Sequence, residues 1–366
     1  MTLAAVRDFI DGLVGRGAAS IAVPSMDGAL KPNSALDRAE VLFECAAPQD
    51  LATDGQSLFL ADGAALVRIV EGRAVVVREF DEPITALACL PDCTLALALA
   101  GTEVHVFARP DDETPAASFS GAGMTSINAL SPAADGALYA TSGSAVHGVE
   151  EWVRDLMARG RTGCVLRLDV ASRKVSKLAD RLEYAFGAAA TNGGALVAET
   201  WRHRLVAIGA DGGRRIVLNH LPSYPSRLTA ASGGGWWMTA FACRTQLVEF
   251  VLREPEFRRR MMAEIDPDHW IAPRLVSSRS TLEPIQGAHV TMMGVVKPWA
   301  PPRSYGLIVR LNAAAEPVFS LHSRADGENH GIVSAVEHQG FLYAVAKGPR
   351  RVLRLSCEHL AEEFGA

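Results

Sequence analysis

The chain has 366 residues, of which 49% are hydrophobic and 21% charged, and its formal net charge is −5. A chain of this composition can bury a large apolar core without disulfides or metals, and its acidic balance argues against nucleic acid as a partner. No stretch approaches the ~20 apolar residues that a transmembrane helix needs. We therefore expect a soluble, cytoplasmic protein with no transmembrane segment, and no feature of the sequence specifies an oligomeric state.

Residues 1–40 are expected to form an N-terminal helix and a lead-in segment. The text MTLAAVRDFIDGLVGRG alternates charged and apolar residues at helical spacing, and it lacks the uninterrupted apolar run of a signal peptide. The six cysteines are scattered through apolar stretches of the sequence, which is typical of reduced, buried thiols. Residues 41–366 are expected to form one domain.

One sequence pattern recurs six times in this domain. It consists of a turn rich in Asp, Asn or Gly, a run in which apolar residues alternate with small or polar ones, a short polar break and often a second apolar run. The copies begin at Asp54, Pro91, Ala134, Asn192, Gly233 and Gln339. Period-two alternation is the signal of β-strands, and a spacing of about 40 residues over much of the chain is that of a four-stranded blade. Because a blade cannot bury both faces alone, the pattern predicts an all-β fold, a six-bladed β-propeller, with a pair of β-sandwiches as the alternative.

Two segments are predicted to be helical insertions, near residues 150–160 (EEWVRDLMARG) and 252–265 (LREPEFRRRMMAEI). Both have helical periodicity, good helix formers and no internal glycine. We expect them in the connections between blades, where they either cover one end of the central channel or pad its rim.

Several stretches resemble the strictosidine synthase-like family, in the order in which that family has them. They include INALSPAADGALYATSGS, LVAETWRHRLVAI and LPSYPSRLTAASGGGWWM, and FACRTQLVEFVLREPEFRRRMMAEI is similar to the helical insertion of the adipocyte plasma membrane-associated protein-like members. The resemblance implies a six-bladed propeller of the gluconolactonase–paraoxonase superfamily. That superfamily contains lactonases, esterases and synthases that form carbon–nitrogen bonds, so the resemblance specifies the fold more closely than the chemistry.

The resemblance also implies a calcium site, in which one Glu, one Asp and two Asn from the inner ends of the blades bind the ion. At the matching positions this sequence has Gln49, Asn128, Phe186 and Ser226, and Arg227 follows Ser226. A hard cation prefers several oxygen ligands with acidic charge, and a neighbouring guanidinium opposes it. We therefore expect no metal cofactor, with calcium possible but disfavoured.

The synthase members use a glutamate of blade six as general base, and the matching position here is Val333. Glu328 and His330 lie a few residues upstream and are the candidate replacements, because a His with a neighbouring Glu suits proton transfer near neutral pH. The alternative is that both are solvated loop residues.

Two further residues are candidates for substrate binding. Trp201 follows the AET motif of blade four, where an aromatic ring beside Arg202 could hold a planar anion. His147 lies in a stretch that lines the pocket entrance in the family that this sequence resembles. A surface loop is the alternative for both.

The leading hypothesis is an enzyme that hydrolyses an ester or lactone at the mouth of the central channel. Gln49, Asn128 and Arg227 would bind the carbonyl or developing oxyanion, His330 would act as base, and Phe186 would supply an apolar floor. Ser226 would line the same pocket. The alternatives are a lyase or synthase that uses Glu328, and a non-catalytic propeller that binds a small molecule.

Overall fold

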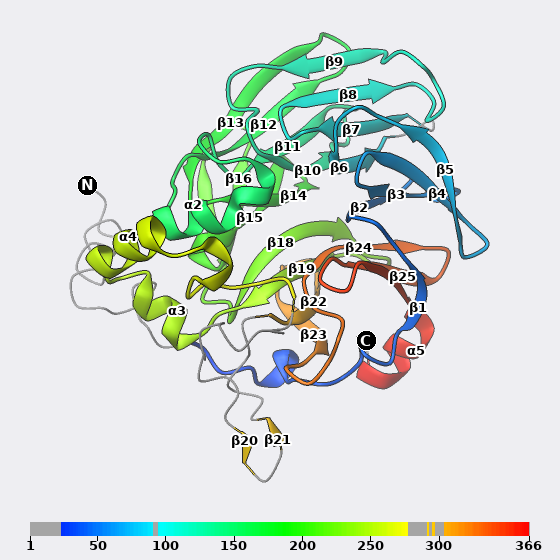
Figure 1. Ribbon diagram of the computed structural model, residues 1–366. Coiled ribbons are helices and arrows are strands. Elements are labelled where there is room, and N and C mark those ends of the chain that lie inside the picture. The colour runs from blue at the N-terminus through cyan, green and yellow to red at the C-terminus, as the bar shows by residue number, and fades with distance from the viewer. Residues whose placement is uncertain (1–22, 91–93, 277–290, 293–294, 297–303, 366) are drawn as a thin grey trace.

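Six four-stranded antiparallel sheets surround a central axis in the computed structural model of the protein, which describes residues 23–90, 94–276, 291–292, 295–296 and 304–365 (Figure 1). The first strand of each sheet contacts the first strands of both neighbouring sheets, so the six inner strands close into a ring. The predicted six-bladed β-propeller is confirmed.

Blades one to three follow one another along the chain, each with its strands in sequence order from the channel outward. Their strands are β2 (Pro48–Thr53), β3 (Leu58–Asp62), β4 (Ala65–Val70) and β5 (Arg73–Glu79), then β6 (Ile84–Cys89), β7 (Leu95–Leu99), β8 (Glu103–Phe107) and β9 (Ala117–Ser120), then β10 (Ile127–Pro132), β11 (Leu138–Ser142), β12 (Gly163–Asp169) and β13 (Lys174–Leu182).

Blades four and five repeat this order, and blade six combines both ends of the chain. Their strands are β14 (Ala185–Thr191), β15 (Gly194–Glu199), β16 (Arg204–Gly209) and β17 (Arg214–Leu218), then β18 (Ser223–Ala230), β19 (Trp236–Cys243), β22 (Gly306–Leu311) and β23 (Pro317–Ser323), then β24 (Ile332–His338), β25 (Phe341–Ala346), β26 (Arg351–Ser356) and β1 (Glu40–Glu44). The N-terminal strand β1 is thus the outermost strand of the last blade, and this pairing closes the ring between the two ends of the chain.

Each of the six repeats of the sequence pattern contains the second strand of one blade. These strands are apolar because blades stack on both of their faces, and β11 and β15 are buried along their whole length. Leu95–Leu99, with the sequence LALAL, alternates large and small side chains and leaves room for the neighbouring sheets.

The helices lie within blades three and five rather than between blades, which corrects the predicted placement. The 3₁₀ helix η3 (Val149–Glu151) and helix α2 (Trp152–Ala158) join β11 to β12, while α3 (Gln246–Val251), α4 (Pro255–Glu264) and η5 (Pro267–His269) follow β19. Both insertions follow the second strand of their blade, so they begin at the end of the channel where the inner strands start. Helices α2, α3 and α4 lie together on one side of the propeller (Figure 1).

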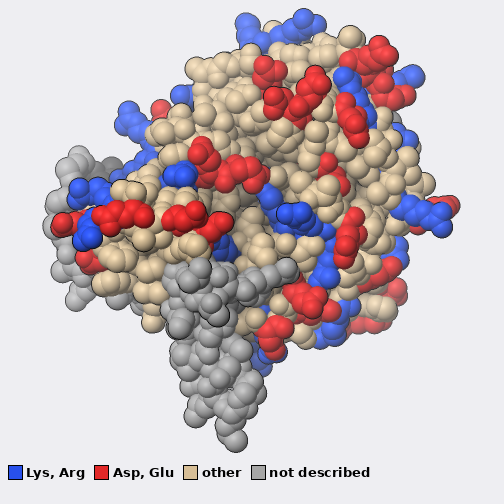
Figure 2. Space-filling view, viewed as in Figure 1, with Lys and Arg blue, Asp and Glu red and all other residues tan. Residues whose placement is uncertain are grey.

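Three short elements complete the described fold: η2 (Gly28–Leu30), η4 (Thr200–Arg202) and the C-terminal helix α5 (Cys357–Phe364), besides the two-residue strands β20 (Thr291–Met292) and β21 (Val295–Val296). The predicted N-terminal helix falls largely on residues 1–22, outside the described part. Among the described residues, no helix is both long and apolar enough to span a bilayer. On the face shown in Figure 2, acidic and basic side chains are interspersed.

Candidate functional site

A small cavity lies at the mouth of the central channel, where the inner strands begin. Gln49, Phe186 and Val333 line it, and each is the second residue of its inner strand. The cavity measures about 20 Å³, which is room for about one water molecule. A substrate of ordinary size would therefore enter only after the groups above the cavity move.

Aromatic rings form one wall of the cavity. Trp152 comes from helix α2, while Tyr184, Phe186 and Phe241 come from blades four and five. Phe241 meets Trp152 edge-on with ring centroids 5.0 Å apart, and Trp201 packs behind Tyr184 at 4.3 Å. This wall joins the helical insertion to the propeller and presents an apolar surface to a ligand.

Three polar side chains from distant parts of the chain meet at the rim. Lys347, in the turn between β25 and β26, donates to Gln49 Oε1 at 2.9 Å and to the two carboxylate oxygens of Glu150 at 2.8 and 3.1 Å. Gln49 Nε2 donates to Glu150 Oε1 at 2.7 Å. Glu150 belongs to η3, so this group, which we call the rim latch, holds the helical insertion to blades one and six.

The two charges of the rim latch shift each other's titration. Burial lowers the pKa of Lys347, although Glu150 opposes this shift. Partial burial acts to raise the pKa of Glu150, but the ion pair with Lys347 and the hydrogen bonds from Lys347 and Gln49 outweigh it and leave that pKa below its usual value. Each of the two charges thus offsets part of the cost of burying the other.

The floor of the cavity is the guanidinium of Arg227, which is 5% exposed. Its Nη1 donates to the carbonyls of Gln49 (3.1 Å) and Val333 (3.0 Å), and its Nη2 donates to the carbonyl of Thr85 (2.8 Å). Its Nε lies 3.1 Å from Oδ2 of Asp50. Arg227 thus reaches from blade five to blades one, two and six.

Asp50 is the buried carboxylate that balances this charge. It accepts hydrogen bonds from the backbone N–H groups of Leu51 and Leu87, both at 2.9 Å, and from the Ser334 hydroxyl at 2.7 Å. Burial raises the pKa of Asp50, whereas Arg227 and these donors act to lower it. Arg227 and the three hydrogen-bond donors therefore offset only part of the cost of burying this carboxylate.

A glycine brings the floor and the aromatic wall together. Gly187 has φ of +103°, and a Cβ atom at this position would lie 2.4 Å from the carbonyl oxygen of Ser226. Only a residue without a side chain permits this approach. Phe186 and Arg227, the neighbours of these two residues, consequently meet with the guanidinium 5.1 Å from the ring centroid.

Asn128 and Ser226 do not line the cavity. Asn128 donates to the carbonyl of Ala185 and accepts from the Thr141 hydroxyl, while Ser226 Oγ lies 2.8 Å from Thr239 Oγ1. These hydrogen bonds tie adjacent strands and blades and occupy the polar atoms. Asn128 is fully buried and lies outside the lining of the cavity, so it does not reach a substrate carbonyl there, contrary to the expected role.

The donor set does not fit the calcium ion that the resemblance implies. Asn128 and Ser226 are engaged elsewhere, Phe186 offers no oxygen, and Gln49 belongs to the rim latch. The carbonyl oxygens that do converge here accept hydrogen bonds from the guanidinium of Arg227, which already supplies a positive charge at this place.

His330 is buried away from the cavity, with 1% of its surface exposed. Its Nε2 lies 2.7 Å from the carbonyl of Arg324 and its Nδ1 2.8 Å from Ser304 Oγ. Because a carbonyl only accepts, Nε2 carries the proton and Nδ1 accepts from the serine. Burial lowers the pKa of His330, and both ring nitrogens have partners. The structure therefore does not bring the expected general base to the channel cavity.

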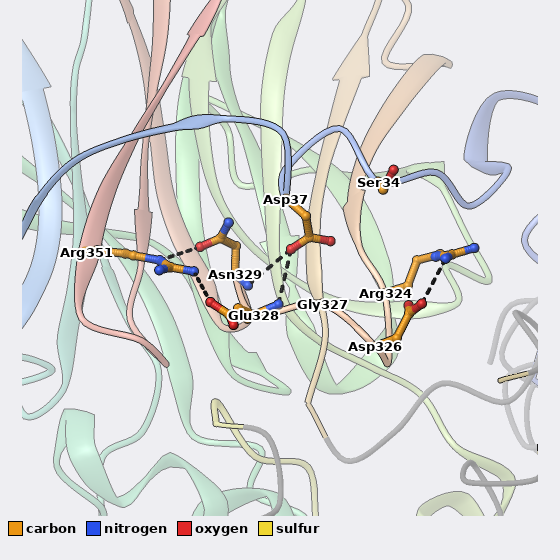
Figure 3. A pocket seen from close by; sticks show the side chains of 8 residues that line it. All are labelled: Ser34, Asp37, Arg324, Asp326, Gly327, Glu328, Asn329 and Arg351. Atoms are coloured by element: carbon orange, nitrogen blue, oxygen red, sulfur yellow. Dashed lines mark hydrogen bonds and ion pairs between the residues drawn. The ribbon is translucent and has the colours of Figure 1, made fainter. Parts of the chain in front are cut away.

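Glu328 lines a separate, open pocket of about 290 Å³ between the lead-in segment and blade six (Figure 3). It pairs with Arg351 at 3.2 Å, and Asp37 accepts from its backbone N–H. Neither Glu328 nor His330 is among the residues that line the channel cavity.

His147 and Trp201 flank the helical insertion rather than the cavity. His147 Nδ1 lies 3.9 Å from Glu151 on the outer side of η3. Trp201 is buried and donates from Nε1 to Asp155 of α2 at 2.8 Å. Of the residues predicted from the sequence, Gln49, Phe186 and Arg227 line the cavity. Asp50, Glu150 and Lys347 were not among the predicted residues.

The fold and this site define a six-bladed propeller with a covered, aromatic-walled cavity at the channel mouth. Solved structures of the same fold include a gluconolactonase from Xanthomonas campestris (TM-score 0.54, 14% identity, 91% of this chain and 96% of that chain) and the calcium-binding protein regucalcin from Agrobacterium tumefaciens (TM-score 0.53, 10% identity, 87% and 92%).

Among curated proteins, the chain is similar to the adipocyte plasma membrane-associated protein of mouse, with 26% identity over 374 residues that cover 92% of this chain and 82% of the relative. The human protein matches at 26% identity over 87% of this chain. No protein-family model matches. The family resemblance predicted from the sequence is confirmed.

Proposed function

We propose that the protein hydrolyses a small ester or lactone at the channel mouth without a calcium ion. The observation that carries the proposal is the rim latch: an ammonium, a carboxylate and an amide converge at the edge of an aromatic-walled cavity. One protein of the same fold, from Xanthomonas campestris, is a gluconolactonase, which is consistent with this class of reaction.

The chemistry follows from the charges of the latch. With the substrate carbonyl against Lys347, the ammonium would stabilise the oxyanion that forms as water attacks. Glu150 would accept the proton of that water and return it to the departing alkoxide, so that one acid and one alcohol, or one hydroxy acid, result. Gln49 would hold Lys347 and Glu150 in position through its hydrogen bonds to both side chains.

A non-catalytic binding propeller is the second candidate, because Lys347 already makes three hydrogen bonds within the latch. In that case an apolar molecule would displace the insertion and occupy the cavity without reacting.

The test is the initial rate of the full-length protein on panels of esters and lactones in the presence of EDTA. We expect Lys347→Met and Glu150→Gln to lower kcat by about 100-fold or more. Glu151→Gln is the matched control, since Glu151 is the next residue but pairs with His147 and Arg154 instead of Lys347. Turnover that is absent in the wild type, or unchanged in both variants, would reject hydrolysis at this site.

A further inference from the structure

The structure assigns a second role to Arg227: its guanidinium is the fixed central cation of this propeller, held in a cage of oxygens that will accept a free guanidinium ion once the side chain is removed. This inference does not depend on the proposed hydrolysis.

The cage has the composition of a cation site. Carbonyl oxygens of Gln49, Thr85 and Val333 and a carboxylate oxygen of Asp50 surround the guanidinium at 2.8 to 3.1 Å. Carbonyl and carboxylate oxygens are the ligands that hard cations use in proteins. Here they come from three blades, and the cation comes from a fourth, so the charge joins inner strands that share no backbone pairing.

The shape of the cage suits a planar cation rather than a spherical one. The three carbonyl oxygens accept hydrogen bonds from Nη1 and Nη2 of Arg227, and the carboxylate of Asp50 lies within ion-pair distance of Nε. The ring of Phe186 lies 5.1 Å from the central carbon of the guanidinium and supplies a cation–π contact. A metal ion placed among the same oxygens would also face the guanidinium at short range, and the repulsion would oppose its binding. The side chain therefore takes the place that the ion would need.

The cage is part of a ring of polar contacts between inner strands. Thr85 Oγ1 donates to the carbonyl of Ile127 (2.7 Å), Asn128 donates to Ala185 (3.0 Å), and Ser334 donates to Asp50 (2.7 Å). Each bond connects neighbouring blades, whereas Arg227 bridges across the channel. Loss of the guanidinium would leave its buried oxygens without their partner, and a buried carboxylate without its counter-charge.

Chemical rescue of Arg227→Ala tests this role. The vacated space would adjoin the channel cavity, which Arg227 already borders, so a small cation can enter when the insertion opens. We expect the variant to unfold at a lower temperature than the wild type, and millimolar methylguanidinium chloride to raise its unfolding temperature by a few degrees through binding to the folded state. The wild type should show no such rise.

Controls separate a specific site from a general effect of salt. Sodium chloride and urea at the same concentration should not rescue Arg227→Ala. Arg244→Ala is the matched variant, because Arg244 is equally buried but pairs with one carboxylate, Glu249, and one carbonyl, Leu221. Equal rescue of both variants, rescue by calcium instead of methylguanidinium, or no rescue at all would each overturn the proposal.

If Arg227→Ala does not fold, Arg227→Lys provides the measurement. A single ammonium cannot reproduce the planar contacts to all four oxygens, so we expect a reduced unfolding temperature that neither calcium nor EDTA changes. Restoration of wild-type stability by calcium would show that the cage prefers a metal and would overturn the assignment.

Discussion

Trp201 and Asp155 join the helical insertion to the propeller through one buried hydrogen bond, from indole Nε1 to Oδ1 at 2.8 Å. Asp155 is 2% exposed and lies on α2, whereas Trp201 belongs to η4 of blade four. The carboxylate lies so close to Gly160 that a Cβ atom there would be 2.2 Å from it. Together with the rim latch on the other side, this bond fixes α2 above the cavity.

The two substitutions Asp155→Ala and Asp155→Asn should therefore differ. The alanine leaves a buried indole N–H without an acceptor, which costs about 1–3 kcal/mol, while the asparagine keeps an oxygen for that bond. Urea unfolding of both variants measures the difference. Equal destabilisation by the two would mean that the hydrogen bond contributes little to the attachment of α2.

The propeller could be predicted from the sequence because its evidence is local and repeated. Each second strand carries its own alternating run, and runs such as LALAL are apolar because blades cover both faces. The helices could also be predicted from the helical periodicity of their sequence. Their place within blades three and five depends on which strands pair with each other, and short sequence patterns do not specify that pairing.

The site was only partly predictable, because it is assembled by long-range contacts. Lys347 lies 197 positions from Glu150 and 298 from Gln49. The register irregularity between Pro48 and Asp50 interrupts the alternation of side chains along β2. Asp50 therefore points toward Arg227, although the family resemblance draws attention only to its neighbour Gln49. His330 looked like a base in the sequence, and its burial follows from the packing of Ser304 and Arg324 around it.

The rim latch should control entry to the cavity. Glu150→Gln removes the ion pair with Lys347 and keeps the size of the side chain, so we expect faster association of a small apolar fluorophore that binds at the channel mouth. Stopped-flow measurement of the association rate checks this, with Glu151→Gln as control. An unchanged rate in Glu150→Gln would show that the latch does not limit access.

The buried pair of Asp50 and Arg227 should show strong energetic coupling. Asp50→Asn or Arg227→Met alone leaves an unbalanced buried charge or unpaired oxygens and should cost about 3–5 kcal/mol. The double variant should be less destabilised than the sum of the two, because neither charge then remains unpaired. A double-mutant cycle from urea unfolding measures the coupling, and strict additivity would mean that the two residues act independently.

Acid stability should depend on Glu249, which is buried on α3 between Arg244 (3.0 Å) and His203 (3.4 Å). Burial acts to raise the pKa of Glu249, but the hydrogen bonds and charges of His203 and Arg244 outweigh it and lower that pKa from 4.5 to about 2. The folded state therefore holds this proton less tightly than the unfolded state. The resulting stabilisation is fully present above pH 4.5 and is lost as the pH falls toward 2.

Glu249→Gln should be less stable than the wild type at pH 6, and the difference should shrink between pH 4.5 and 2 because only the wild type loses the carboxylate. Urea unfolding across this range measures the effect, with the exposed Glu264→Gln as control. A constant difference between Glu249→Gln and the wild type at every pH would show that the charge of Glu249 does not stabilise the fold, and that its loss disturbs only packing.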